Sequence, residues 1–179
     1  MKTKIILLSI ILIIFPTIIF AQKQTPTEFV KSFYKFHRSR DEAFSKEEIK
    51  ARQKWFTTEL YELFQYELKR EAEYLKENPT DKPFFGDGFP ITALEECYLK
   101  GKWIKNVLKI GKTSTKKDKT FVEVSFYQPN VCGSYFIHAY KNELVKNKNS
   151  WLINDLIYLD DETMADDSRL SDDLKREKY

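Results

Sequence analysis

The first part of the chain carries apolar residues at every third or fourth position, which is the spacing of an amphipathic helix. Three helix starts are indicated by a threonine or serine that can cap a helix N-terminus. These residues are Thr25, Ser45 and Thr57 or Thr58. The second helix is expected to run to Phe56, and the third should end at Asn78 because a residue before proline disfavours the α region. The pattern therefore predicts three helices in this part of the chain.

From residue 103 onward the apolar residues alternate with polar ones, as they do in β-strands. Strands are expected at residues 103–110, 120–127, 134–140 and 151–158. The links between them are short and polar, at residues 111–119, 128–133 and 145–150. Short links join antiparallel strands, whereas parallel strands need long crossovers. Helices followed by a meander of at least four strands predict an α+β fold, with N-terminal helices packed on an antiparallel sheet.

The N-terminus has the layout of a cleavable signal peptide. Lys2 and Lys4 precede an apolar run over residues 5–21, which closes on the small residue Ala21. An uncleaved anchor helix is the alternative, but a bilayer span needs about 20 apolar residues, and this run has 17 with a proline near its end. We therefore expect an exported protein, periplasmic or extracellular, with no stable membrane span after processing.

Length and charge narrow the class of protein. Residues 22–160 suit a single domain, and residues 161–179 form an acidic tail in which Ser171 can cap a short helix. Aromatic residues make up 15% of the chain, which favours a packed core over disorder. Removal of the signal peptide lowers the formal net charge from +3 to about +1. A nearly neutral chain disfavours nucleic-acid binding.

Two cysteines, Cys97 and Cys132, are the whole cysteine content of the chain. An even number in an exported protein predicts a disulfide bond between them. Two separate buried thiols are one alternative, because a free cysteine packs as a small apolar residue. A catalytic cysteine is the other, although neither residue stands in a known nucleophile motif.

The order of these segments resembles a known family. The segments are PTEFVKSFYKFH, WFTTELYELF, FFGDGF, TFVEVSFY and WLINDLIY. Together they resemble an uncharacterised family of exported bacterial domains in the nuclear-transport-factor-two-like, or cystatin-like, superfamily, over residues 26–160. The resemblance implies a curved antiparallel sheet wrapped around the helices to form a cone with a cavity at one end. It implies no reaction, because fold does not fix function, and no residues match the acid and hydroxyl of ketosteroid isomerases.

Asp155 is an acid in the alternating set of the last predicted strand, in line with Trp151 and Ile153. The resemblance implies a closing strand with a tryptophan, an apolar residue two positions on and an acid just after. We therefore expect Trp151 and Ile153 to be buried against the helices. Asp155 should lie where the strand leaves the core, in water or hydrogen-bonded to a neighbouring strand or helix. A catalytic base in a pocket is the alternative.

Other candidate residues are few. Histidine is the side chain that can serve as a general base at neutral pH without a pKa shift, and the sequence offers His37 and His138. We expect His138 on the outer sheet face, with a pocket role as the alternative. His37 is expected near a helix C-terminus, where positive charge is favoured. Zinc-ligand spacings are absent from the sequence, and Asp81 and Asp87 are too few for a calcium loop. No metal or other cofactor is expected.

Lysines are concentrated over residues 100–119, a segment that contains eight lysines and one acid, Asp118. A solvated strand face that protects a sheet edge is the simpler interpretation. A basic surface is the alternative, and its anionic partner would be an envelope surface, an acidic protein or residues 160–173 of the chain itself.

Two functions of different class follow. The first is an exported, non-enzymatic binding or accessory domain that binds a protein or small molecule at the cone cavity or sheet face. The second is an enzyme with acid and base groups in that cavity. The candidate binding residues are His138, Asp155, Tyr127 and Tyr140. A pocket with two or more converging titratable groups would favour the enzyme, whereas the lack of a catalytic motif favours binding.

Overall fold

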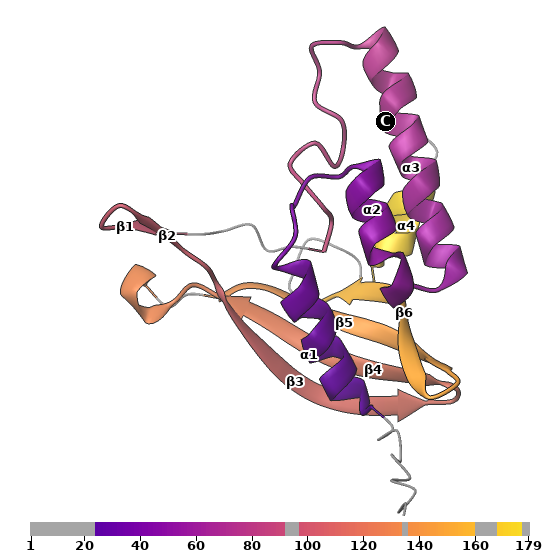
Figure 1. Ribbon diagram of the computed structural model, residues 1–179, viewed down its shortest axis with the longest axis vertical. Coiled ribbons are helices and arrows are strands. Elements are labelled where there is room, and N and C mark those ends of the chain that lie inside the picture. The colour runs from indigo at the N-terminus through magenta and orange to yellow at the C-terminus, as the bar shows by residue number, and fades with distance from the viewer. Residues whose placement is uncertain (1–23, 92–96, 134–135, 160–167, 177–179) are drawn as a thin grey trace, which may run out of the picture.

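The computed structural model describes residues 24–91, 97–133, 136–159 and 168–176, which form an α+β structure (Figure 1). The helices are α1 (Pro26–His37), α2 (Lys46–Arg52), α3 (Thr58–Glu77) and α4 (Leu170–Lys175), with 3-10 helices η1 (Gln53–Trp55) and η2 (Asn130–Cys132). The strands are β1 (Cys97–Leu99), β2 (Lys102–Ile104), β3 (Val107–Lys116), β4 (Lys119–Tyr127), β5 (Phe136–Asn147) and β6 (Ser150–Tyr158). The predicted signal peptide lies outside the described residues. Within them, no helix is long and apolar enough to cross a membrane.

The predicted helix starts are confirmed. The side chains of Thr25, Ser45 and Thr57 accept a hydrogen bond from the backbone N–H three residues on. The prediction that the second helix reaches Phe56 is wrong, because α2 gives way to η1 and Phe56 is extended. Phe56 leaves the helix to form a parallel bridge with Ile153. The next backbone N–H, that of Thr57, then donates to the Ile153 carbonyl at 2.9 Å.

Strands β3, β4, β5 and β6 form one antiparallel sheet in chain order. Its strands are longer than predicted, because most of residues 111–119 and 145–150 belong to strands. The turns between β3 and β4 and between β5 and β6 are only two residues long. Each places a lysine at positive φ, 57° at Lys117 and 52° at Lys148. Glycine and asparagine are the usual signals for that conformation, so the sequence suggested longer loops.

The core lies between the sheet and the helices. Strand β4 alternates strictly, with Val122, Val124 and Phe126 buried. Helix α1 contacts β3, β4 and β6, while α3, α4 and η1 contact β6 at the sheet edge (Figure 1). Ile153 is fully buried, as predicted. Trp151 is only half-buried against the core, where its indole N–H donates to the Gln24 carbonyl at 2.9 Å.

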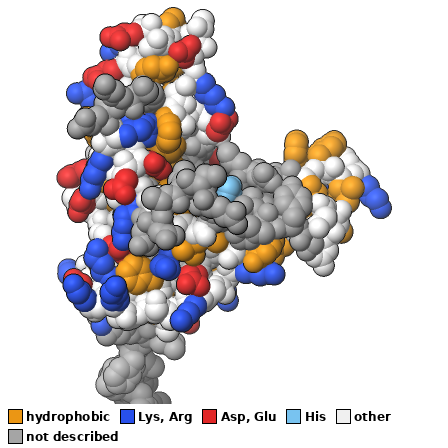
Figure 2. Space-filling view, turned by 180° about the vertical axis from the view of Figure 1, so that it is seen from behind, with side chains coloured by type: hydrophobic (Ala, Val, Ile, Leu, Met, Phe, Trp, Pro, Cys, Tyr) orange, Lys and Arg blue, Asp and Glu red, His pale blue; other side chains and the backbone are white. Residues whose placement is uncertain are grey.

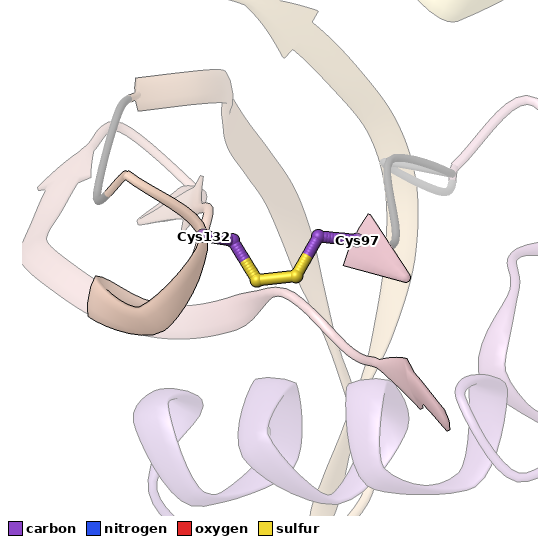
Figure 3. The surroundings of a disulfide bond; sticks show 2 residues. All are labelled: Cys97 and Cys132. Carbon is purple, nitrogen blue, oxygen red and sulfur yellow. A yellow bond between two sulfur atoms is a disulfide. The ribbon is translucent and has the colours of Figure 1, made fainter. Parts of the chain in front are cut away.

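Strands β1 and β2 pair only with each other and project from the body of the protein (Figure 1). The predicted strand over residues 103–110 is therefore two strands, β2 in this hairpin and β3 in the main sheet. A disulfide joins Cys97 on β1 to Cys132 on η2, with 6.1 Å between their Cα atoms (Figure 3). We call β1, β2 and η2 together the arm.

Candidate functional site

The four predicted binding residues lie on two faces of the sheet. Tyr140 pairs with Val124 and faces the helices. His138 pairs with Phe126 and lies on the same side, with 6.3 Å between its ring centroid and that of Tyr140, so the expectation of the outer face is wrong. Tyr127 lies on the other face, as the alternation of β4 requires. The four residues therefore do not converge on one pocket.

Tyr140 is part of the hydrophobic core. Its ring lies 6.0 Å from that of Phe126 and 5.8 Å from that of Tyr158, measured between centroids. The Tyr158 hydroxyl donates to Asp173 Oδ2 at 2.9 Å. Burial, followed by the charge of Asp173, raises the pKa of Tyr158 above its usual value, so that its hydroxyl stays protonated. This arrangement fastens α4 to the sheet.

The prediction that Asp155 lies where the strand leaves the core is wrong. A β-bulge in β6 places Asp155 opposite Glu143 instead of Asn142. This shift of one residue changes the sheet face that the Asp155 side chain occupies. Asp155 is 4% exposed. Its Oδ1 accepts the N–H groups of Leu156 at 2.9 Å and Ser171 at 3.1 Å. The alternative of a hydrogen bond to a neighbouring helix is therefore the correct part of the prediction.

The second carboxylate oxygen of Asp155 completes a buried charged network. Asp155 Oδ2 accepts from the Ser171 hydroxyl at 2.7 Å and from Arg169 Nη1 at 3.1 Å. Arg169 Nη1 also donates to Glu143 Oε2 at 3.0 Å. Glu143 is buried, but hydrogen bonds from Lys119, Arg169 and Asn154 outweigh that burial and lower its pKa. We call Glu143, Asp155, Arg169 and Ser171 the C-terminal latch.

Part of the predicted acidic tail is folded as α4 and packs on the protein. Arg169 occupies the N-cap position of α4, and its side chain makes no capping hydrogen bond. Ser171 lies inside the helix, so the prediction that it caps the helix is wrong. Leu170 and Leu174 are fully buried in the core. The described part of the tail, residues 168–176, is therefore a packed element of the fold.

His37 lies in a buried network between α1 and α2, and the expectation of a charged histidine is wrong. Its Nδ1 accepts a hydrogen bond from Arg52 Nε at 2.8 Å, which requires the neutral ring. Burial, followed by the charges of Arg52 and Arg38, lowers the pKa of His37 to about 3. Arg52 is fully buried, bonds Glu48 Oε2 at 2.5 Å and lies over the Phe89 ring at 4.3 Å. This network holds two helices and a loop together.

A groove of about 490 Å³ lies between α3 and the segment over residues 83–88. Its walls are mainly apolar, with Glu42, Glu71 and Asp87 as acids. Glu71 Oε1 accepts the Phe85 N–H at 2.8 Å, and Asp87 pairs with Lys82. Asp81 accepts the Tyr74 hydroxyl at 2.8 Å. In the described part of the chain, no group of three or more possible metal ligands is found.

The arm carries the two most exposed aromatic side chains of the described residues. Trp103 is 66% exposed and Tyr98 is 61% exposed. The two residues are direct cross-strand partners, with ring centroids 5.0 Å apart. Leu99 and Val131 of the arm, and Val107 at the start of β3, add exposed aliphatic groups. Figure 2 shows hydrophobic side chains on the projecting part of the molecule. Exposed apolar groups gathered in this way are typical of a binding surface.

Neither family models nor curated proteins nor solved structures match the chain. The resemblance to the nuclear-transport-factor-two-like superfamily, with its cone, stays a prediction.

Trp103 and Tyr98 were missed as candidate residues, although a signal was present. The segment CYLKGKWI places Lys100 and Gly101 between two short apolar segments, and both residues have positive φ, 50° and 78°. Such a glycine-containing pair is a hairpin signal. The latch had no comparable signal, because its residues come together only when the C-terminal segment folds onto β6.

Proposed function

We propose that the chain is an exported, non-enzymatic binding domain that contacts its partner through the arm. The observation that carries the proposal is the pair of exposed rings, Tyr98 and Trp103, at the end of a projecting hairpin. Large exposed apolar groups are unfavourable in water and are retained where a partner covers them. Trp and Tyr are also the side chains most enriched in binding hot spots.

The placement of the titratable candidates supports binding over catalysis. Catalysis by acid and base requires two such groups within hydrogen-bond reach of one substrate. Tyr140 and Asp155 instead occupy opposite sheet faces, and each is engaged with groups of the fold. His37 accepts from a buried arginine. Each of these groups has a structural role that accounts for its environment.

Export is supported by the disulfide between Cys97 and Cys132, because such bonds persist in oxidising compartments. Mass spectrometry of the native protein should show a chain that begins at or near Gln22. A native chain that retains Met1 or Lys2 would refute export.

Site-specific photo-crosslinking tests the arm. Trp103 is replaced by the photo-reactive amino acid benzoyl-phenylalanine in the cells that produce the protein, and the matched control carries it in place of Tyr66. Tyr66 is 54% exposed but lies on α3, away from the arm. We expect crosslinked protein or lipid from position 103 in clear excess over position 66. Equal yields from the two positions would contradict the proposal.

A further inference from the structure

The arm combines its exposed rings with charge of one sign. Lys100, Lys102, Lys105 and Lys109 are the only charged residues from 97 to 109, and all four are exposed. The residues of η2 are uncharged. The nearest acids in sequence, Glu95 and Glu96, lie outside the described residues. Within the described arm and the start of β3, the charge is entirely positive.

Two of these lysines are available at the tip of the hairpin. Lys105 Nζ donates to the Arg38 carbonyl at 3.1 Å, and Lys109 Nζ lies over the Tyr127 ring at 4.1 Å. Lys100 lies in the turn and Lys102 opens β2, directly opposite Leu99. Both therefore lie at the hairpin tip, with Lys102 on the face opposite to that of Tyr98 and Trp103. Lysine can extend its ammonium group toward an anionic surface while its methylene chain stays on apolar groups.

The size and shape of the surface distinguish between partners. A standard protein interface uses about 20–30 residues on each side, whereas the arm offers four exposed apolar side chains: Tyr98, Leu99, Trp103 and Val131. The arm is also convex, because it projects from the body (Figures 1 and 2). So few exposed apolar side chains suit shallow insertion into a lipid headgroup region better than a protein interface of standard size. A second arm of the same charge would be repelled.

We propose that the arm docks the protein onto an anionic lipid surface. Trp103 and Tyr98 enter the headgroup region, where amphipathic aromatic rings are favoured, and Lys100 and Lys102 contact lipid phosphates. Docking through rings and lysines together is the chemistry of peripheral membrane association. The inference rests on the proposed function, in that it names the partner of the same surface.

Vesicle sedimentation tests the inference with the protein purified after expression of the full chain. One set of vesicles is phosphatidylcholine, and the other is phosphatidylcholine mixed with phosphatidylglycerol. We expect preferential, salt-sensitive binding to the anionic vesicles. Trp103→Ala should weaken the partition about tenfold, through loss of buried apolar area. Lys100→Gln and Lys102→Gln should each weaken it about fivefold.

Matched variants separate the arm from general surface effects. Tyr66→Ala removes an exposed ring and Lys69→Gln an exposed charge on α3, and both should bind as the unaltered protein does. Brominated lipid should quench tryptophan emission in the unaltered protein but not in Trp103→Ala, where Trp55 and Trp151 remain. Intact secondary structure by circular dichroism shows that each variant is folded.

Each remaining outcome decides between the proposals. Absence of binding to anionic vesicles, or binding that Trp103→Ala leaves unchanged, overturns the lipid inference. The vesicles can fail to bind while position 103 crosslinks a protein, or while Trp103→Ala converts a dimer of this chain into monomers. In either case the arm is a protein-binding surface, and the proposed function stands. If neither vesicles nor crosslinks involve the arm, both proposals fall.

Discussion

Replacement of Asp155 by asparagine tests the C-terminal latch, because the change removes the charge while nearly keeping the shape. The amide oxygen can still accept the N–H groups of Leu156 and Ser171. The amide nitrogen, however, replaces Oδ2. In the unaltered protein Oδ2 accepts from Arg169 at 3.1 Å and from the Ser171 hydroxyl at 2.7 Å. The hydroxyl can rotate and accept, but the guanidinium cannot. One charge-assisted hydrogen bond is therefore lost.

The expected loss of stability follows from the burial of the two partners. A hydrogen bond to a charged group contributes about 1.5–3 kcal/mol. The side chain of Asp155 is 6% exposed and that of Arg169 is 32% exposed, so solvent screens the pair in part. Arg169 also keeps its bond to Glu143. We therefore expect Asp155→Asn to lower the free energy of unfolding by about 2 kcal/mol.

Urea unfolding at neutral pH measures this change, and hydrogen exchange locates it. Exchange should accelerate over residues 168–176, because the latch holds this segment on β6. Asp172→Asn is the matched control, since Asp172 is an exposed acid one residue after Ser171, and it should change stability by less than about 0.5 kcal/mol. A variant as stable as the unaltered protein would refute the latch. A more stable Asp155→Asn would indicate a carboxylate held unfavourably, as at a functional site.

Three further changes probe the rest of the fold. The pKa of His37 is lowered from 6.5 to about 3, so the neutral ring's contribution to the free energy of unfolding is complete above pH 6.5 and is lost on acidification, at up to about 1.4 kcal/mol per pH unit. His37→Asn should reduce this pH dependence, measured by urea unfolding between pH 6.5 and 4.5. The same pH dependence in the variant and the unaltered protein would contradict the prediction. Leu174→Ala should lower the free energy of unfolding by about 3 kcal/mol, because Leu174 is fully buried, and thermal unfolding measures the change. A loss under about 1 kcal/mol would show that α4 is not part of the core. Cys97→Ser with Cys132→Ser should cost about 3 kcal/mol through lost chain constraint, and reactive thiols in the unreduced native protein would refute the bond.

The sequence predicted the elements whose signals are local. A capping residue such as Thr25 or Thr57 acts on a backbone group three positions away, so its effect can be recognised without the fold. The alternation of β4 is equally local, because the residues that face the core differ from their neighbours in polarity. These signals were sufficient for the α+β class and for most helix bounds.

The sequence could not predict features that depend on a change of register. The bulge in β6 inserts one residue, so the alternation of Trp151 and Ile153 no longer places Asp155. Likewise, His37 and Arg52 are 15 residues apart, and their hydrogen bond exists only because α1 and α2 pack together. Burial of Asp155 and neutrality of His37 are therefore tertiary effects.

Stability and binding are separated in this molecule, and the separation can be tested. A two-stranded hairpin is marginally stable by itself. The disulfide joins the hairpin of β1 and β2 to η2, which follows strand β4 of the main sheet. The exposed rings of the arm contribute little to the core, because Trp103 is 66% exposed. Trp103→Ala should then leave the free energy of unfolding within about 0.5 kcal/mol of its original value, while it weakens binding. Asp155→Asn should do the reverse. If Trp103→Ala unfolds the protein as readily as Asp155→Asn, the rings stabilise the fold, and the arm would have no surplus apolar surface to offer a partner.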